Sequence, residues 1–326
     1  MPHVIPVDCH YRGLPRFAAA YLVLDGDRAA FVDNNTVRAV PRLLESLRTH
    51  GVAPSQVDYL VVTHAHLDHA GGTAALAEAC PDATILAHPK AAPHLVDPEK
   101  LVAGATAVYG QETFDELYGR VDPVPEARVR VVEDGEAVAF GGGEWTILHT
   151  RGHADHHFCL HDPAAGVLFA GDAFGLCYPD LQEHGTLAFP STSPTGFRPA
   201  EARAAVDRIL EVEPETVFLG HFGALDARIL PEAARQLHQH LHFAGELARE
   251  AEAGDLPDEA LQGWVQPRLL DYFRGVFDGL GPLGRDPKVW DLLSMDLELN
   301  AQGIAFAARK ARFKASRAAD ARPERG

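Results

Sequence analysis

The sequence predicts an α/β protein whose last third is helical. Up to about residue 230, short apolar runs rich in β-branched residues alternate with segments of helical periodicity. Glycine, proline and aspartate separate these runs in the way that turns require. Beyond Pro231 the strand signals end, and leucine and alanine recur at helical spacing. These three observations together predict a mixed sheet region followed by a helical extension.

The first half of the α/β region predicts four strands and three helices. The strands are short apolar runs, the first two separated by a turn at Asp25-Gly26-Asp27, and they cover residues 20–24, 29–32, 57–62 and 83–87. The helices have apolar residues at helical spacing and cover residues 37–50, 73–80 and, with weak points at Gly104 and Gly110, 98–118.

The second half repeats this style without a detectable sequence repeat. The predicted strands are residues 129–132, 137–140, 145–149, 157–160, 167–169 and 216–219, and the predicted helix is 199–211. Further helices are expected from residue 231, near 259–277 and over 288–312. The polar residues after 313 predict a loose tail. The expected organisation is therefore a domain over 1–230, a helical extension over 231–312 and a tail over 313–326.

Composition and charge argue against several classes of partner. Hydrophobic residues make up 46% and charged residues 23% of the chain, an ordinary globular balance. The net charge of −17 argues against nucleic acid and anionic membranes, which attract positive proteins. No apolar run reaches the roughly 18–20 residues that a membrane span needs, and no signal peptide is evident. Four widely spaced cysteines predict free thiols in a cytoplasmic protein.

The strongest chemical signal follows the predicted strand 57–62. Here Thr63-His64-Ala65-His66-Leu67-Asp68-His69 places three histidines and an aspartate within six residues, before Gly71-Gly72. Imidazole and carboxylate groups bind zinc, and imidazole also binds iron. A lone His-x-His pair is weak evidence, but the full pattern at the end of a buried strand predicts a metal site.

The chain resembles the metallo-β-lactamase superfamily of metallo-hydrolases in this motif and in three later ones. The segment His149-Thr-Arg-Gly-His153-Ala-Asp-His-His157 is similar to the family's second motif, usually HTPGHTPGH. Gly171-Asp172 and Gly220-His221 are similar to its third and fourth motifs, and each follows a predicted strand. The resemblance covers about residues 15–230. It implies an αββα four-layer sandwich, two mixed sheets with helices outside, carrying the helical C-terminal extension.

By this resemblance the chain holds two divalent metal ions, zinc as the first expectation and iron or manganese as alternatives. One ion is held by His64, His66 and His153, the other by Asp68, His69 and His221, and Asp172 bridges them. The pair is expected to generate hydroxide from a shared water near neutral pH. Asp68 is the candidate for proton transfer.

Three further residues are candidates for supporting roles. Asp33 resembles the family's early strand-end aspartate, although Asn34-Asn35 follow it where Thr-Gly is usual; a plain turn cap is an equal alternative. His157 matches the last histidine of the second motif and is interpreted as an orienting group rather than a ligand. Tyr178 is a candidate hydrogen-bond donor in the substrate pocket, with packing as the alternative.

The motifs do not decide the reaction, because one fold serves many chemistries. The first hypothesis is a binuclear metal-dependent hydrolase of a small ester, thioester or lactone. The alternatives are a mononuclear iron-dependent oxidoreductase similar to persulfide dioxygenases, a phosphodiesterase, or a metal-bound module without turnover. The motifs are similar to those of glyoxalase II, within a little-characterised archaeal and bacterial branch. The expected partner is a small-molecule substrate, with no nucleic acid or membrane, and a homodimer is expected.

Overall fold

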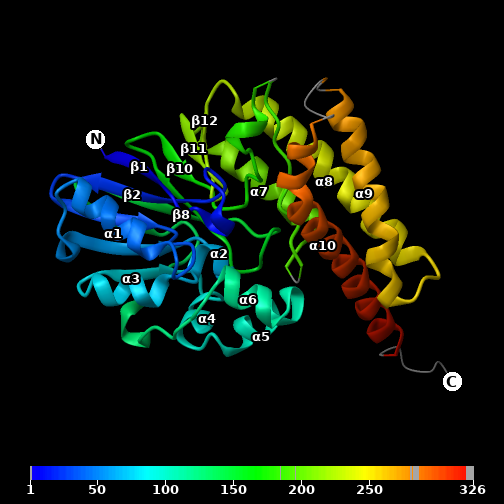
Figure 1. The fold of residues 1–326 in the computed structure, drawn as a ribbon, viewed down its shortest axis with the longest axis horizontal. Coiled ribbons are helices and arrows are strands. Elements are labelled where there is room, and N and C mark those ends of the chain that lie inside the picture. The colour runs from blue at the N-terminus through cyan, green and yellow to red at the C-terminus, as the bar shows by residue number, and fades with distance from the viewer. Residues whose placement is uncertain (1, 184, 195, 280, 282–285, 321–326) are drawn as a thin grey trace.

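The computed structural model describes residues 2–320 apart from 184, 195, 280 and 282–285. Its two six-stranded sheets pack face to face, with helices on their outer faces (Figure 1). The α/β class and the αββα arrangement with a helical C-terminal region are thereby confirmed.

The first sheet has the order β1-β2-β3-β4-β5-β6. Its strands are β1 (His3–Asp8), β2 (Ala19–Asp25), β3 (Arg28–Val32), β4 (Val57–Val62), β5 (Thr84–Ala87) and β6 (Val129–Val131). The first three strands pair antiparallel, and β3 to β6 pair parallel. Because parallel strands send their carboxyl ends to one edge, the chain after β4 emerges beside the ends of β3 and β5.

The second sheet has the order β12-β11-β10-β9-β8-β7. Its strands are β7 (Ala137–Phe140), β8 (Gly143–His149), β9 (Phe158–Asp162), β10 (Val167–Phe169), β11 (Thr216–Phe218) and β12 (Ala224–Asp226). All neighbours pair antiparallel except β10 and β11, which are parallel. The loops after β10 and β11 therefore leave the sheet at the same edge.

Three apolar layers hold the sandwich together. Between the sheets, Tyr21, Phe158 and Trp145 belong to one buried cluster that both sheets share. A second cluster packs the first sheet against its outer helices, and a third packs the second sheet against α7 and the C-terminal helices. The helices of the sandwich are α1 (Val40–Thr49), α2 (Leu67–Ala70), α3 (Thr73–Ala79), α4 (Ala92–Val96), α5 (Glu99–Tyr109), α6 (Gln111–Leu117) and α7 (Pro199–Glu211).

The C-terminal helices lie against one side of the sandwich, at the right of Figure 1. They are α8 (Leu230–Ala253), α9 (Leu261–Asp278) and α10 (Pro287–Asp320). Helix α8 packs against α7, and α10 packs against both α8 and α9. The prediction of a loose tail from residue 313 is wrong over 313–320, because α10 continues through Asp320. Residues 313–317 are exposed, and alanine, lysine and arginine among them favour a helix by intrinsic propensity. Residues 321–326 lie outside the described part of the chain.

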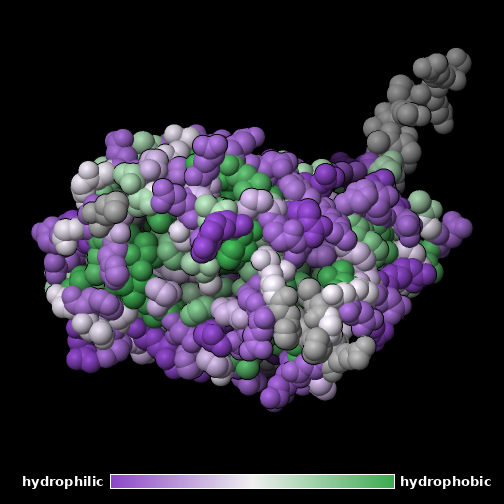
Figure 2. Space-filling model, turned by 90° about the horizontal axis from the view of Figure 1, so that it is seen from above, coloured by the Kyte–Doolittle hydropathy of each residue, from purple (hydrophilic) through white to green (hydrophobic). Residues whose placement is uncertain are grey.

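The face of the molecule seen in Figure 2 is largely hydrophilic, with apolar residues visible in hollows between polar ones. Large exposed apolar side chains among the described residues are Val131 and Phe313. The scattered apolar surface is ordinary for a folded chain.

Candidate metal centre

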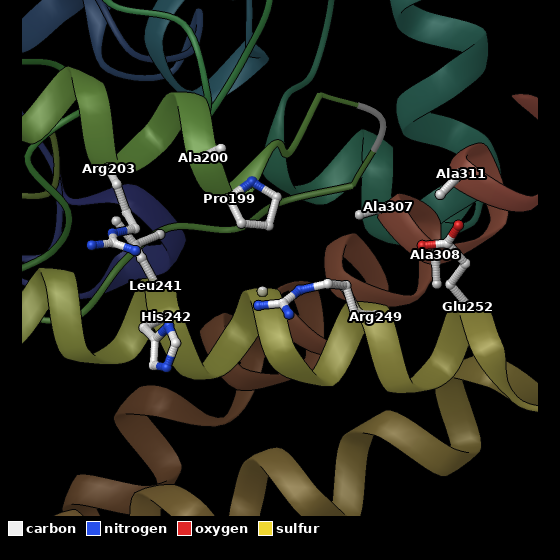
Figure 3. A pocket seen from close by; sticks show the side chains of 12 residues that line it. Pro199, Ala200, Arg203, Leu241, His242, Arg249, Glu252, Ala307, Ala308 and Ala311 are labelled. Carbon is white, nitrogen blue, oxygen red and sulfur yellow. The ribbon is translucent and has the colours of Figure 1, made fainter.

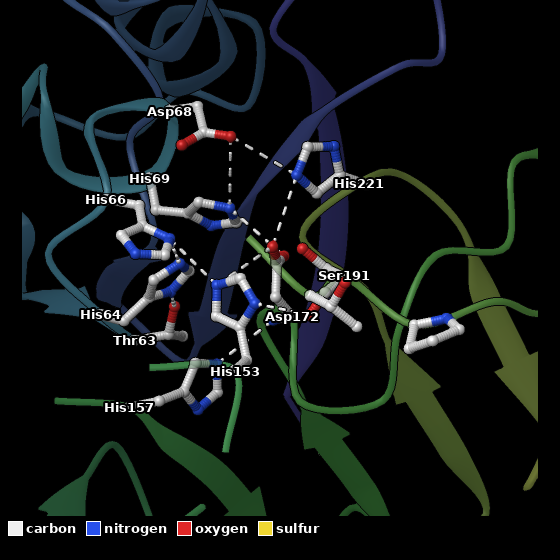
Figure 4. A network of polar contacts seen from close by, with 12 residues as sticks. Thr63, His64, His66, Asp68, His69, His153, His157, Asp172, Ser191 and His221 are labelled. Carbon is white, nitrogen blue, oxygen red and sulfur yellow. Dashed lines mark hydrogen bonds and ion pairs between the residues drawn. The ribbon is translucent and has the colours of Figure 1, made fainter. Parts of the chain in front are cut away.

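All seven predicted metal ligands meet where the strand-end loops of both sheets face each other (Figure 4). The loop after β4 and the short helix α2 supply the four residues of the first motif, and the loop from β8 to β9 supplies His153. Asp172 and His221 follow β10 and β11. The parallel pairing of β10 with β11 is what brings these last two side chains together.

Gly220 makes room for this cluster. A Cβ atom at this position would lie 2.4 Å from the His69 ring and 3.1 Å from an Asp172 carboxylate oxygen. Real Cβ contacts are essentially never shorter than 3.0 Å, so a larger residue would displace the ring. The glycine before His221 is therefore a packing requirement of the site.

The first group of candidate ligands consists of His64, His66 and His153. Nε2 of His64 and Nε2 of His153 lie 3.1 Å and 3.0 Å from Nδ1 of His66. Nδ1 of His153 lies 3.0 Å from the Ser191 carbonyl oxygen, which can only accept, so the proton sits on Nδ1 and the Nε2 lone pair faces the group. A tetrahedral ion with metal–nitrogen bonds of about 2.0–2.1 Å separates its ligands by about 3.3 Å. The three nitrogens are thus close to the spacing that one ion requires.

The second group consists of Asp68, His69 and His221. Oδ2 of Asp68 lies 3.4 Å from Nε2 of His221 and 3.8 Å from Nε2 of His69. Nδ1 of His69 donates to Asp33 Oδ2 at 2.9 Å. Its Nε2 is buried and has no hydrogen-bond partner, and it faces the side chains of Asp68 and His221. A buried orphan of this kind needs a partner, and a metal ion at this point would supply it.

Asp172 lies between the two groups. Its Oδ2 is 3.6 Å from Nε2 of His153 in the first group and 3.5 Å from Nε2 of His221 in the second. Its Oδ1 is 3.3 Å from Nε2 of His69 and has no hydrogen-bond partner. The carboxylate is therefore positioned to contact ions in both groups. Nitrogen and carboxylate donors, convergent and partly orphaned, fit divalent metals such as zinc or iron.

Asp33 and His157 hold this cluster from behind. The Asp33 carboxylate accepts from the backbone N–H and hydroxyl of Thr63, each at 2.9 Å, besides its contact with His69. His157 uses both ring nitrogens, since Nε2 accepts from the Asp172 N–H at 3.2 Å and Nδ1 lies 2.8 Å from the Thr150 hydroxyl. These hydrogen bonds engage both carboxylate oxygens of Asp33 and both ring nitrogens of His157, an arrangement that fits the expected orienting role.

The electrostatics of the cluster favour the charge states that bind metals. Burial lowers the pKa of His64 and of His66, with help from neighbouring imidazoles, which keeps both rings neutral. Burial raises the pKa of Asp172, but His221 and His69 outweigh it and hold that pKa well below its usual range. Although burial lowers it, the carboxylates of Asp172 and Asp68 raise the pKa of His221 to about 10. A metal ion bound to His221 would replace the second proton that this raised pKa lets the ring hold near neutral pH.

The cluster opens into a pocket of about 310 Å³. Five of the seven candidate ligands line it, namely His66, Asp68, His153, Asp172 and His221. One wall comes from α4 and α5 and includes His94 and Lys100; the opposite wall comes from α10 and includes Asp296 and Asn300. The volume suits a small molecule.

Tyr178 does not line this pocket. The structure places it behind His221, fully buried, with its hydroxyl 3.1 Å from Asp296 Oδ2 and 3.5 Å from His221 Nδ1. Its ring stacks on Phe17 at 4.8 Å between centroids. The expected direct contact with substrate therefore gives way to a contact with a candidate ligand.

A second hollow, of about 320 Å³, lies between α7, α8 and α10 (Figure 3). Small apolar residues such as Ala307 and Ala311 line it, together with Arg203, His242 and Arg249. None of the candidate ligands reaches it.

Asp296, Asn300 and Ser191 belong to the site but carry no signal in the sequence. The first two sit in an ordinary amphipathic helix, more than 70 residues beyond the last motif, and Ser191 takes part only through its carbonyl. Thr63 and Thr150 adjoin the motifs, so their hydrogen bonds could have been anticipated from proximity alone.

Comparison with known proteins agrees with this geometry. Residues 13–221 match the family model described as the metallo-beta-lactamase superfamily. The chain belongs to this superfamily. The matched range includes all seven candidate ligands and ends at His221.

Several curated proteins are similar to the chain. It is 26% identical to the metallo-beta-lactamase fold-containing protein ST1585 of Sulfurisphaera tokodaii, over 56% of this chain and 67% of that one. It is 25% identical to a hydroxyacylglutathione hydrolase of Idiomarina loihiensis, over 64% and 70% of the two chains. It is 28% identical to the human acyl-coenzyme A thioesterase MBLAC2, over 34% and 39%. These superfamily relatives therefore include hydrolases of two kinds.

Solved structures match the whole fold. The metallo-beta-lactamase family protein TTHA1429 from Thermus thermophilus superposes with a TM-score of 0.63 at 22% identity, covering 98% of this chain and 94% of that one. ST1585 gives 0.59 at 20% identity, covering 93% and 97%. Both matches extend through the helical C-terminal region. Among the residues that the structure describes, no helix combines the length and apolar character needed to cross a membrane.

Proposed function

We propose that the protein is a binuclear metal-dependent hydrolase of a small ester, thioester or lactone. One observation carries the proposal: two groups of candidate ligands share Asp172 and face a single pocket of about 310 Å³. One group is His64, His66 and His153, and the other is Asp68, His69 and His221. The hydroxyacylglutathione hydrolase and acyl-coenzyme A thioesterase among the relatives support a thioester in particular.

Two divalent ions at these groups would lower the pKa of a shared water and polarise a substrate carbonyl. The remaining work falls to side chains of the protein. The Asp68 side chain is 20% exposed, compared with 3% for Asp172, and it faces the pocket. Asp68 is therefore the carboxylate that a leaving group can reach, and we assign it the proton transfer. Apolar residues of α5 and α10, such as Leu101 and Leu299, line the pocket and limit the access of water to it.

The second candidate is an iron-dependent oxidoreductase acting on a sulfur substrate. The relatives include a nitric oxide reductase of Moorella thermoacetica, 28% identical over 48% of this chain and 33% of that one. TTHA1623, solved in a di-iron-bound form, gives a TM-score of 0.50 at 27% identity. Iron in place of zinc would favour this reaction, and turnover of phosphodiesters alone would favour a phosphodiesterase. The cytoplasmic location and the homodimer stay predictions.

The role of Asp68 can be tested by Asp68→Asn, which keeps the shape and removes the carboxylate base. With two ions verified per chain, we expect kcat on an ester and thioester panel to fall by about 10²–10⁴ while KM changes little. Asp82→Asn, at an exposed position after α3, is the matched control and should behave as wild type. A metal-loaded Asp68→Asn protein with full turnover would show that another group moves the proton.

A further inference from the structure

One face of α10 is turned toward the metal centre. Asp296, Asn300 and Gly303 are spaced by four and three residues, so they lie in a row along the helix. Asp296 and Asn300 are 8% and 3% exposed, although charged and amide side chains are usually at the surface. Burial of two such groups calls for specific partners, and each has them in the sandwich domain.

Asn300 holds the segment that fixes His153. Its Oδ1 accepts from the Thr192 N–H at 2.6 Å, and its Nδ2 donates to the Pro190 carbonyl at 2.9 Å. The Thr192 hydroxyl donates to the Asn300 backbone carbonyl at 3.1 Å. Between these two anchored residues lies Ser191, whose carbonyl accepts from Nδ1 of His153. The orientation of a first-group ligand thus depends on a side chain of α10.

Gly303 permits this contact, because α10 approaches the same loop without a side chain in between. A Cβ atom on Gly303 would lie 1.6 Å from the Thr192 carbonyl oxygen. The helix and the loop are therefore in direct backbone contact one turn beyond Asn300. This close approach sets the distance between α10 and the loop at which the Asn300 side chain forms its hydrogen bonds.

Asp296 reaches His221 through Tyr178. The Tyr178 hydroxyl donates to Asp296 Oδ2 at 3.1 Å, and its oxygen lies 3.5 Å from Nδ1 of His221, at the outer limit of a hydrogen bond. With the Nε2 lone pair turned toward Asp68 and Asp172, Nδ1 carries the proton and can donate to the tyrosine oxygen. In this series of hydrogen bonds the histidine donates to the tyrosine oxygen and the tyrosine hydroxyl donates to the carboxylate, so each donor meets an acceptor.

We propose that Asp296 and Asn300 are positioning residues of the metal centre, each orienting one histidine ligand from the other side of the domain boundary. Asn300 serves the first group through His153, and Asp296 serves the second group through His221. The helical C-terminal region is then a structural part of both metal sites rather than an appendage. This inference rests on the proposed binuclear centre.

The test measures metal affinity rather than activity. Zinc is titrated into metal-free protein against a competing chelator, and cobalt-loaded protein is followed by its visible absorption spectrum. Loss of a ligand's outer hydrogen bond costs about 10–100-fold in metal affinity. Asn300 and Asp296 each act through one intervening residue, so we expect Asn300→Ala to weaken the binding of one ion, and Asp296→Ala that of the other, by up to this factor. Tyr178→Phe should match Asp296→Ala, and Asp296→Asn, which keeps an acceptor, should recover part of the loss.

The matched control is Glu298→Gln, which removes a carboxylate from the exposed side of the same helix; it should bind both ions as wild type does. A merely structural role would lower the melting temperature of the metal-free variants and leave both affinities and the cobalt spectrum unchanged. That outcome, with wild type binding two ions, would overturn the inference and leave the proposed function standing. Wild-type protein that binds no second ion would instead overturn the binuclear centre, and the inference with it.

Discussion

Replacing Gly303 by alanine tests how closely α10 must approach the sandwich. The new Cβ would lie 1.6 Å from the Thr192 carbonyl oxygen, whereas ordinary contact begins at 3.4 Å. Helix and loop must therefore separate by about 1.8 Å, the difference between these two distances. Such a shift would stretch the Asn300 contacts, now 2.6, 2.9 and 3.1 Å, beyond hydrogen-bonding range.

The expected cost follows from these contacts. Overpacking costs about 1–3 kcal/mol, and the lost hydrogen bonds contribute about 1 kcal/mol each. The helix propensity of alanine returns about 1 kcal/mol. A net loss of about 3–5 kcal/mol corresponds to about 4–7 °C in melting temperature for a chain of this length, at roughly 2.1 cal/mol/K per residue.

The assay is thermal unfolding of metal-free Gly303→Ala beside a matched glycine variant. A Cβ added at Gly275 in α9 would meet no neighbouring atom within 4 Å, so Gly275→Ala should be neutral or stabilising by up to about 1 kcal/mol. Equal melting temperatures for the two variants would refute the close packing of α10 on the loop that follows Pro190.

Three further predictions concern the cluster and the helical region. Asp33→Asn should weaken metal binding by about 10–100-fold in a chelator competition, because an amide cannot accept from both Thr63 and His69; unchanged affinity would remove Asp33 from the site. Burial lowers the pKa of His240 to about 4. In the unfolded chain this imidazole is protonated near pH 6.5, whereas in the folded protein it stays neutral down to about pH 4. The free energy of unfolding should therefore be highest above pH 6.5 and fall by up to about 3 kcal/mol as the pH is lowered to 4. Denaturant unfolding at several pH values should show a shallower decline for His240→Leu, and an identical one would contradict the assignment. Chelation should lower the melting temperature of metal-loaded protein, an effect that Asp172→Asn should abolish; a chelator without effect would argue against bound metal.

Much of the sandwich could be predicted because its signals are local. The β-branched run of β4 (Val57–Val62) and the helix α7 (Pro199–Glu211) have the predicted bounds. The expected helix over 98–118 is in fact two helices, α5 and α6, with Gly110 at φ 80° between them. The weak point was visible in the sequence, but whether the helix would break there depended on packing.

The sequence did not predict two strands that depend on pairing with a neighbouring strand. Strand β1 (His3–Asp8) contains a proline and alternates poorly, and it exists because β2 supplies its hydrogen bonds. Strand β12 (Ala224–Asp226) is three residues long and pairs only with β11. Both are edge strands, where pattern is weak and the neighbouring strand decides. Helix α4 (Ala92–Val96) is likewise too short for a periodic signal.

The candidate site divides in the same way. The seven candidate ligands were available from the motifs, because the chemistry requires those residue types directly after strands. Asp296 and Asn300 were not, because their place beside His221 and His153 depends on how α10 docks. Helical spacing places Asp296 and Asn300 on the same stripe of α10 as the buried Leu293 and Leu297. It does not show which residues of the sandwich that stripe contacts.

The binuclear centre can be tested by the metal content of the protein, purified without added metal and counted per chain by elemental analysis. We expect about two divalent ions per chain, with zinc alone or mixed with manganese or iron, and loss of both ions when His153 and His221 are replaced together. A single iron per chain, with oxygen uptake on a persulfide, would contradict the binuclear hydrolase and support the sulfur oxidoreductase instead.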